Sequence, residues 1–381
     1  MPDDFQIFVK PVGAVCNLGC TYCYYLSKKD LYESSGSLRM SDDILEKYIK
    51  QHIEASSDDT IFFSWHGGEP LLAGIDFYRK VVSMQKKNLP SGRKVLNGIQ
   101  TNGTLLDEEW CHFLKSENFI IGISIDGPPD LHNKHRITPA GDHTSERVLR
   151  GYELLKKFKI TSEILCVVNS SNSLHPLEVY NFFRQLGTEY LSFLPLVERD
   201  PSGEAGVSES TVRPEDFGRF LSVIFDEWTG HDIGKIKVQI FEEALRPAFN
   251  QEHTLCIFKV DCGRVPVLEH NGDFFSCDHF VDHVHMIGNI LHKPVSEMLY
   301  DPQQKRFGKA KSQTLPRYCL QCDVLSMCNG ECPKNRFITT PDGQPGLNYL
   351  CSGYKLFFNN CKPFISVLRE IGLQQKTSGS L

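Results

Sequence analysis

Apolar runs alternate with amphipathic segments along the first two-thirds of the chain. Six short runs rich in β-branched and aromatic residues predict strands at 5–12, 60–65, 94–100, 119–125, 161–168 and 189–195. Between and after them, apolar residues recur with helical spacing and predict helices at about 41–55, 73–88, 107–117, 144–158, 174–186 and 213–230. Strands separated by such helices are typical of βαβ units and a parallel sheet. The pattern favours an α/β fold with a partial (β/α)6 TIM-like barrel; a doubly wound open sheet stays an alternative.

Polar or glycine-bearing motifs follow four of these predicted strands. Cys16–Cys23 comes after the first strand, His66–Pro70 after the second, Gln100–Gly103 after the third and Ser124–Pro128 after the fourth. In a parallel barrel the loops at the carboxyl ends of the strands converge over a rigid base, and active sites form there. Any one of these motifs could be a simple turn, but four on one rim predict a site.

The overall composition excludes several classes of protein. Charged residues make up 23% and hydrophobic residues 40% of the chain, as in ordinary globular proteins. The net charge of −6 argues against a nucleic-acid partner, which would normally face a basic surface. Phe119–Ile125, about the longest apolar segment, is far shorter than the ~20 residues that cross a bilayer, and the N-terminus shows no targeting signal. We therefore expect a cytoplasmic protein without nucleic-acid or membrane partners.

Cysteine is the outlier, with 14 residues among 381. In a reducing compartment a cysteine-rich chain binds metal or performs redox chemistry more often than it forms disulfides. Three cysteines stand near the N-terminus and nine crowd the last third from Cys256 onward. This asymmetry suggests a boundary near residues 230–255, and with the chain length we expect two domains at residues 1–235 and 236–381, the second smaller and irregular. The motifs below make that second domain an iron–sulfur cluster-binding one.

The N-terminal cysteines have the spacing C-x3-C-x2-C, at Cys16, Cys20 and Cys23. Three thiolates in one loop can hold three irons of a four-iron cluster and leave the fourth iron open to a small molecule. Zinc is the alternative, but a structural zinc site needs a fourth Cys or His nearby, and this loop contains none.

This cysteine motif, with Tyr22 before its last cysteine and Gly-Gly-Glu-Pro after the second strand, resembles the radical S-adenosylmethionine enzymes. The resemblance implies that the open iron chelates S-adenosylmethionine and that reductive cleavage gives a 5′-deoxyadenosyl radical, which takes a hydrogen atom from the substrate. It also implies a set of cofactor contacts, at Tyr22, Gly68, Ser124, Arg136 and, through the backbone, Val197.

The C-terminal cysteines have the spacing C-x2-C-x5-C-x3-C-P, which is similar to the bacterial ferredoxin run whose last cysteine binds the other cluster of a pair. We therefore predict two fully ligated [4Fe–4S] clusters, called the auxiliary clusters below. The first takes Cys256, Cys262, Cys277 and Cys332, and the second takes Cys319, Cys322, Cys328 and Cys351. Cys111, Cys166 and Cys361 are left as ordinary thiols. Zinc is again the alternative, since paired C-x2-C motifs often bind it.

This C-terminal layout resembles the SPASM domain, and the whole chain resembles the anaerobic sulfatase-maturating enzymes. The segments that carry the second resemblance are Lys10–Leu18, Gln100–Leu105, Cys277–Phe280 and Asn348–Cys351. It implies oxidation of a Cys or Ser in a sulfatase C/S-x-P-x-R segment to Cα-formylglycine, on an unfolded or nascent sulfatase polypeptide. It implies three [4Fe–4S] clusters and S-adenosylmethionine as cofactors, and an electron donor such as ferredoxin or flavodoxin.

The resemblance gives Asp278 the role of the base that takes the substrate proton. We expect a clustered anionic environment to raise its pKa toward neutrality, which suits a base. His279 is a rival base, and the role of His66 stays open because some members of the family have Gln there. The sequence leaves open the physiological sulfatase, the preference for Ser or Cys, the reductant and the oligomeric state.

Two other functions compete with this interpretation. Another SPASM-type peptide maturase, for example one that forms thioether crosslinks, often carries an extra N-terminal recognition domain, and the first strand here begins at about residue 5. A ferredoxin-like electron carrier would need neither a three-cysteine open site nor a barrel of this length.

Overall fold

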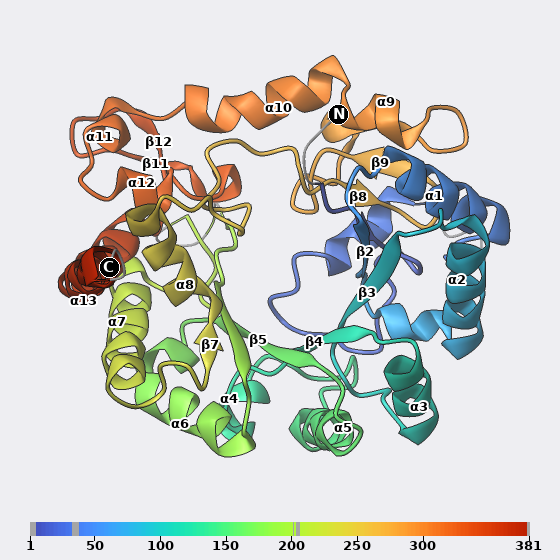
Figure 1. Cartoon of the computed structure of the whole chain (residues 1–381), viewed down its shortest axis with the longest axis horizontal. Coiled ribbons are helices and arrows are strands. Elements are labelled where there is room, and N and C mark those ends of the chain that lie inside the picture. The colour runs from blue at the N-terminus through green and yellow to red at the C-terminus, as the bar shows by residue number, and fades with distance from the viewer. Residues whose placement is uncertain (1–4, 33–37, 201, 203–205, 379–381) are drawn as a thin grey trace. The chain divides into compact units, whose positions relative to one another are not determined.

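The computed structural model describes residues 5–32, 38–200, 202 and 206–378 (Figure 1). Their contacts form two compact units, each assembled from segments distant in the sequence. The first unit contains the described residues up to Ile125, Pro129–Ile164 and Gly263–Lys309, and the second contains Asp126–Pro128, Leu165–Cys262 and the residues from Ala310 onward. Among these residues, no helix is long and apolar enough to cross a membrane.

A parallel strand–helix repeat forms the first part of the first unit. Its strands are β1 (Phe8–Val9), β2 (Thr60–Trp65), β3 (Lys94–Thr101) and β4 (Ile120–Ser124), and its helices are α1 (Asp42–Ala55), α2 (Ile75–Asn88), α3 (Glu108–Ser116), α4 (Pro129–His132) and α5 (Ser145–Lys157). Figure 1 shows α1, α2 and α3 along one side of β2 and β3. The register pairs Val9 with Trp65, Trp65 with Ile99 and Ile99 with Ile121, so four buried side chains lie side by side.

Side-chain caps fix where these helices begin. Ser41 accepts a hydrogen bond from the Ile44 N–H at 3.3 Å before α1, and Asp107 accepts one from the Trp110 N–H at 2.8 Å before α3. Each cap satisfies a backbone N–H that has no partner in the first turn of a helix.

Residues 263–309 add three short strands to the first unit, which the sequence pattern did not predict. β8 (Val267–Leu268) pairs with β1 in parallel, and β9 (Asp273–Phe275) and β10 (Met286–Asn289) continue antiparallel, followed by α9 (Val295–Leu299). Strands of two to four residues are too short to show an alternating pattern. Their consequence is that the loop after β9, which contains Cys277 and Asp278, belongs to the same unit as the N-terminal cysteines.

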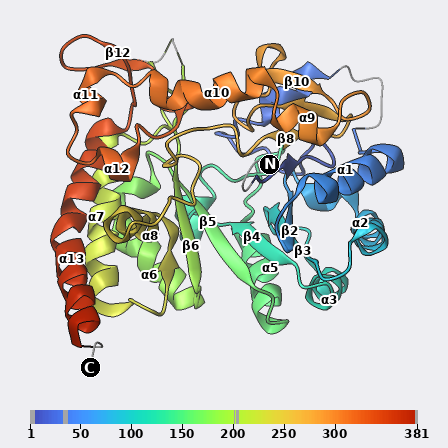
Figure 2. The same cartoon turned by 45° about the horizontal axis from the view of Figure 1, so that its top comes forward.

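The second unit combines the last strands of the repeat with the cysteine-rich segment. Its strands and helices are β6 (Tyr190–Pro195), β7 (Lys237–Val238), β11 (Ile338–Thr339), β12 (Pro345–Leu347), α6 (Pro176–Leu186), α7 (Pro214–His231), α8 (Gln239–Leu245), α11 (Arg317–Leu320), α12 (Leu325–Cys328) and α13 (Cys351–Ser378). The division between the units falls within β5 (Ser162–Val168) and α10 (Pro302–Gln313). α13 lies along α7 in both views (Figures 1 and 2).

Glycines allow α7 and α13 to pack closely. A Cβ on Gly353 would lie 2.1 Å from the Pro214 carbonyl oxygen, and one on Gly218 would lie 2.6 Å from the Gly353 carbonyl oxygen. No other residue fits at these positions without separating the helices. This contact anchors the helix that begins at Cys351.

All six predicted strands and all six predicted helices of the repeat are present, so the α/β class is confirmed. The first strand is shorter than predicted, Phe8–Val9 instead of 5–12, because the chain turns at Pro11–Ala14. That turn leads directly into the cysteine motif.

Candidate active site

The loop that follows β1 carries the three N-terminal cysteines. Cys16, Cys20 and Cys23 are half-buried, and the Cys16 sulfur accepts a hydrogen bond from the Leu18 N–H at 3.3 Å. Burial, together with the nearby charges of Glu69 and the other two cysteines, raises the pKa of the Cys16 thiol to about 12. Three thiolates so close to a carboxylate repel one another, and a bound iron cluster supplies the positive charge that offsets this repulsion. The donor set therefore fits the cluster.

The loop after β3 holds the cysteine loop in place. The Asn17 side-chain amide donates to the Thr104 hydroxyl at 2.8 Å, and the Asn102 amide donates to the Asn17 side-chain oxygen at 2.9 Å. The Asn102 amide also lies 3.8 Å from the Cys16 sulfur, within hydrogen-bond range for sulfur. Hydrogen bonds of this kind orient metal ligands from outside the coordination sphere.

The backbone of Gly68 and Glu69, after β2, hydrogen-bonds to the start of the cysteine loop. The Gly68 N–H donates to the Gly13 carbonyl and the Glu69 N–H donates to the Val15 carbonyl, both at 2.8 Å. A Cβ on Gly68 would lie 2.1 Å from the Val15 carbonyl oxygen. Contact with the cysteine loop therefore requires glycine here, in addition to the cofactor approach expected from the sequence.

The fully buried carboxylate of Glu69 joins the loops after β2 and β3. It accepts hydrogen bonds from the Leu71 N–H at 3.0 Å, the Thr101 hydroxyl at 2.7 Å and the Asn102 N–H at 2.8 Å. Burial raises its pKa to about 7 despite these donors. The sequence drew attention to the Gly-Gly-Glu-Pro motif but gave this side chain no role.

Four of the five predicted cofactor contacts, Tyr22, Gly68, Ser124 and Arg136, lie on loops and strand ends of the first unit. Ser124 is the last residue of β4, and its hydroxyl accepts from the Gln100 amide at 3.1 Å. Arg136 is buried, and its guanidinium lies 5.6 Å from the centre of the Tyr22 ring. Val197 is buried in the second unit, shortly after β6.

Asp278 is buried in the first unit, next to Cys277. Its carboxylate forms an ion pair with Lys10 at 2.7 Å and accepts a hydrogen bond from the Tyr24 hydroxyl. Burial alone would raise its pKa, but the charges of Lys10 and His279 and the hydrogen bonds from Lys10 and Tyr24 lower it to about 2. The expectation of a raised pKa is therefore wrong, because the sequence did not place a lysine there.

The pair of Lys10 and Asp278 continues into a second buried acidic group. Lys10 is 2% exposed, and its ammonium lies 4.1 Å from the centre of the Tyr25 ring. The Tyr25 hydroxyl donates to the fully buried Glu269. No motif in the sequence gave a role to the side chains of Lys10, Tyr24, Tyr25 or Glu269. The available signal was a lysine inside the apolar strand predicted at 5–12, because lysine is rarely buried without a partner.

The two histidines discussed from the sequence have different surroundings. The His66 ring stacks on Phe8 with centroids 3.9 Å apart, and its Nε2 hydrogen-bonds with the Ser64 hydroxyl at 2.9 Å. Burial, with a contribution from Lys10, lowers the His66 pKa to about 3, so the ring is neutral at physiological pH. The His279 ring lies 5.0 Å from the Tyr24 ring, and its charge interacts with the Asp278 carboxylate.

Four cysteines line one small pocket in the second unit, together with Tyr354 and Lys355. They are Cys319, Cys322, Cys328 and Cys351, the set that the spacing assigns to the second auxiliary cluster. Four thiols around one space are the donors of a closed four-iron cluster, so this set fits the group. Of the first set, Cys256, Cys262 and Cys332 lie in the second unit and Cys277 in the first. Cys111, Cys166 and Cys361 are fully buried.

Comparisons with known proteins agree with this geometry. Residues 11–182 match the radical SAM superfamily, and residues 262–323 match SPASM, an iron–sulfur cluster-binding domain. The chain is thus a radical S-adenosylmethionine oxidoreductase with a SPASM domain. This result excludes the two alternatives of zinc binding and a simple electron carrier.

The particular family follows from individual relatives. The chain is 42% identical to the serine-type anaerobic sulfatase-maturating enzyme of Bacteroides thetaiotaomicron, over 98% of this chain and 94% of the relative. The structure of native anSMEcpe with bound AdoMet superposes with a TM-score of 0.87 at 31% identity, covering 96% of this chain and 99% of that one. A structure of anSMEcpe with AdoMet and the Cp18Cys peptide gives the same TM-score. The chain belongs to the anaerobic sulfatase-maturating enzymes, and the predicted class of reaction is confirmed.

Proposed function

We propose that this enzyme oxidises serine, as well as cysteine, in a C/S-x-P-x-R segment of a sulfatase polypeptide to Cα-formylglycine. The buried Asp278 carries the proposal, because it places a charged proton acceptor in the same unit as the three-cysteine loop. The serine-type relative at 42% identity supports activity on serine.

Cys16, Cys20 and Cys23 would hold the cluster that binds S-adenosylmethionine. When bound, these two groups supply the radical that removes a hydrogen atom from Cβ of the substrate. The proposed contacts to S-adenosylmethionine are those expected from the sequence, namely Tyr22, Gly68, Ser124, Arg136 and Val197. A guanidinium and a hydroxyl suit the carboxylate of the ligand, since charge-assisted hydrogen bonds are among the stronger ones in proteins.

Asp278 would take the proton from the substrate hydroxyl or thiol. Serine becomes the aldehyde by losing one hydrogen atom from Cβ, one proton from the oxygen and one electron. Asp278 accepts that proton, and Lys10 and Tyr24 hold the carboxylate ionised and oriented until it does so. With cysteine, the corresponding thioaldehyde needs water to release sulfide.

The remaining electron would leave through the auxiliary clusters, so the enzyme would hold three [4Fe–4S] clusters. We further propose a domain boundary at 235/236, where the cysteine pattern changes, an electron donor such as ferredoxin or flavodoxin, and a location in the cytoplasm, where thiols stay reduced.

The test is anaerobic incubation of the reconstituted enzyme with S-adenosylmethionine, a reductant and matched peptides that differ only in Ser, Cys or Ala at the target position. The serine peptide should lose two hydrogens and then react with a hydrazide, because the product is an aldehyde. Only the cysteine peptide could give a crosslinked thioether, which would lose two hydrogens, keep its sulfur and fail to react with the hydrazide. Turnover of the cysteine peptide alone would contradict the proposed activity on serine.

A further inference from the structure

Two cationic side chains lie inside the second unit among the cysteines proposed to bind the auxiliary clusters. Lys311, near the end of α10, is 0% exposed, and Arg336 is half-buried. Removing a cation from water costs free energy unless nearby groups stabilise the charge. The surroundings of both side chains show which groups do so.

The Lys311 ammonium is held beside Cys256, a member of the first predicted ligand set. Its ammonium donates to the carbonyl oxygens of Cys256 at 2.9 Å and Ile257 at 2.7 Å. Its charge also interacts with the thiols of Cys256 and Cys262, and with the carboxylate of Glu331. The lysine therefore fixes a positive charge beside at least two proposed cluster ligands.

Arg336 is held by a turn of unusual conformation. Its guanidinium donates to the carbonyl oxygens of Asn329, Gly330, Glu331 and Lys311 at 2.6 to 3.2 Å. Asn329, Gly330 and Glu331 all have positive φ, of 47°, 71° and 54°. A left-handed backbone is costly for residues other than glycine, and such strain gathers at functional positions. The turn directs three carbonyl oxygens at one guanidinium.

The two cations differ in which cysteines they face. The charge of Arg336 interacts with Cys262 of the first predicted set and with Cys319 and Cys328 of the second. The charge of Lys311 interacts with three cysteines of the first predicted set, Cys256, Cys262 and Cys332. Within the second unit, Arg336 is thus common to both sets.

We propose that Lys311 and Arg336 are positioning charges that raise the reduction potentials of the auxiliary clusters, an inference that rests on the proposed ligand sets. Reduction adds one negative charge to a cluster, so a fixed cation nearby stabilises the reduced form more than the oxidised form. Poor access to water keeps this attraction from being screened. The raised potential favours acceptance of the electron released when the substrate is oxidised.

The experiment is a potentiometric titration, followed by electron paramagnetic resonance, of the full-length chain with Cys16, Cys20 and Cys23 replaced by Ala. In this parent, only the auxiliary clusters give a signal. Lys311→Met removes the buried charge at similar side-chain length, and Lys311→Arg keeps it. Lys309→Met is the matched control, because it removes an exposed lysine from the same helix.

We expect Lys311→Met to lower one of the two midpoint potentials by about 59 mV, which is a tenfold change in the equilibrium constant of a one-electron couple. Lys311→Arg and Lys309→Met should leave both potentials unchanged. Arg336→Gln should lower both potentials. Arg336→Lys, which keeps the charge, should leave both at the values of the parent. If Lys311→Met loses iron, Lys311→Gln replaces it with the same expectation, since its amide can still donate hydrogen bonds.

Unchanged potentials in the neutral variants of Lys311 and Arg336, at the iron content of the parent, would overturn the proposal. A parent with clearly fewer than about eight irons would instead contradict the proposed ligand sets. The two failures are therefore distinguishable before any potential is measured.

Discussion

A histidine that is kept neutral lies near each end of β2, yet only one end has the features of an active site. At the amino end, His52 of α1 is 1% exposed, and burial lowers its pKa to about 3. At the carboxyl end, His66 has a pKa lowered to the same value. A shifted pKa alone therefore does not identify the functional end.

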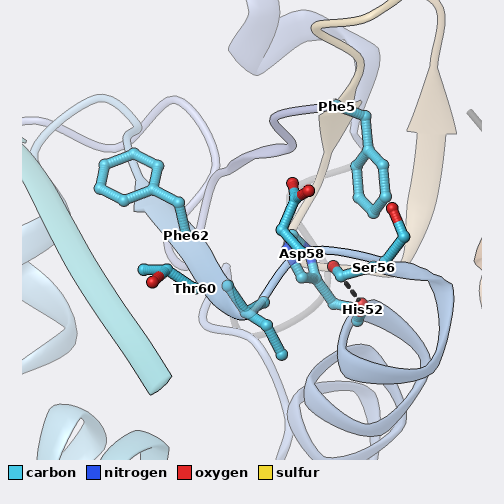
Figure 3. A pocket seen from close by; sticks show the side chains of 8 residues that line it. Phe5, His52, Ser56, Asp58, Thr60 and Phe62 are labelled. Carbon is cyan, nitrogen blue, oxygen red and sulfur yellow. Dashed lines mark hydrogen bonds between the residues drawn. The ribbon is translucent and has the colours of Figure 1, made fainter. Parts of the chain in front are cut away.

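The difference lies in what surrounds each ring. His52 borders a cavity of about 80 Å³ (Figure 3), packs against Phe63 at 4.4 Å between ring centroids, and lies 5.2 Å from the Phe5 ring. The polar contact drawn there is local: the Ser56 hydroxyl donates to the His52 carbonyl at 2.8 Å. At the other end, several loops bring Lys10, Asp278 and the cysteine loop together. In a parallel barrel, active sites form at the carboxyl ends of the strands, where loops from distant parts of the chain converge, whereas the opposite face serves stability. The convergence of loops therefore identifies the end of β2 that carries the site.

The largest effect should come from removing the cysteine ligands at the carboxyl end. The triple replacement of Cys16, Cys20 and Cys23 by Ala should abolish cleavage of S-adenosylmethionine and remove about a third of roughly twelve irons, one of three four-iron clusters. Iron analysis and 5′-deoxyadenosine formation measure this. His52→Gln, at the amino end, is the control and should retain both. Cleavage in the triple variant would refute the assignment of the open site.

The next largest effect concerns Asp278. Asp278→Asn is nearly isosteric but cannot take the substrate proton, so formylglycine formation should fall by ~10²–10⁴-fold. Hydrogen abstraction precedes proton transfer, so S-adenosylmethionine should still be cleaved, uncoupled from peptide oxidation. Both products are measured on the same samples.

Asp278→Asn also leaves Lys10 buried without its carboxylate, so iron content and thermal unfolding are compared with the parent. A parallel fall in both products would show that Asp278 organises the site. If neither product falls, the base is elsewhere, and His279 is the next candidate.

Whether the sequence predicted a strand of this fold depended mainly on the number of residues in that strand. β2, β3 and β5 have six to eight residues, so alternation and flanking helices revealed them. β8 and β9 have two and three residues and are defined by pairing with a distant strand, which no local pattern records. Local spacing likewise pointed to Cys319, Cys322 and Cys328, whereas Cys351 joined their set only through the similarity to ferredoxins, in which the last cysteine of the run binds the other cluster; all four line one pocket.

The electrostatics of the site could not be predicted in the same way. Lys10 and Asp278 meet only because β8 pairs with β1 and brings the loop after β9 beside the first strand. The sequence therefore led to the wrong sign for the pKa shift of Asp278. Glu69 was visible in its motif, but its three donors come from the segment after β2 and from the end of β3 with the loop that follows, which only the fold brings together.

A smaller effect should follow from the predicted S-adenosylmethionine contacts. Arg136→Ala and Ser124→Ala should each weaken binding about ten- to a hundredfold, the ~1.5–3 kcal/mol lost with a charge-assisted hydrogen bond, at unchanged iron content. Equilibrium binding under anaerobic conditions measures this. Arg147→Ala removes an exposed arginine of α5 and should bind like the parent. If both test variants also bind S-adenosylmethionine like the parent, these two residues do not contact it and only form part of the loops around the site.

The smallest effect concerns stability at the amino end. The unfolded chain protonates His52 near its ordinary pKa of about 6.5, whereas the folded chain protonates it only near pH 3. The unfolded state therefore binds more protons between these values, and His52 should lower the free energy of unfolding by about 2 kcal/mol from pH 7 to pH 5. Anaerobic urea unfolding at both pH values measures this, and His52→Gln should remove that part of the loss. His66 contributes equally to both proteins, so their difference isolates His52. The exposed His112→Gln control should lose as much stability as the parent, and an equal loss in all three proteins would mean that the His52 ring takes up its proton without unfolding.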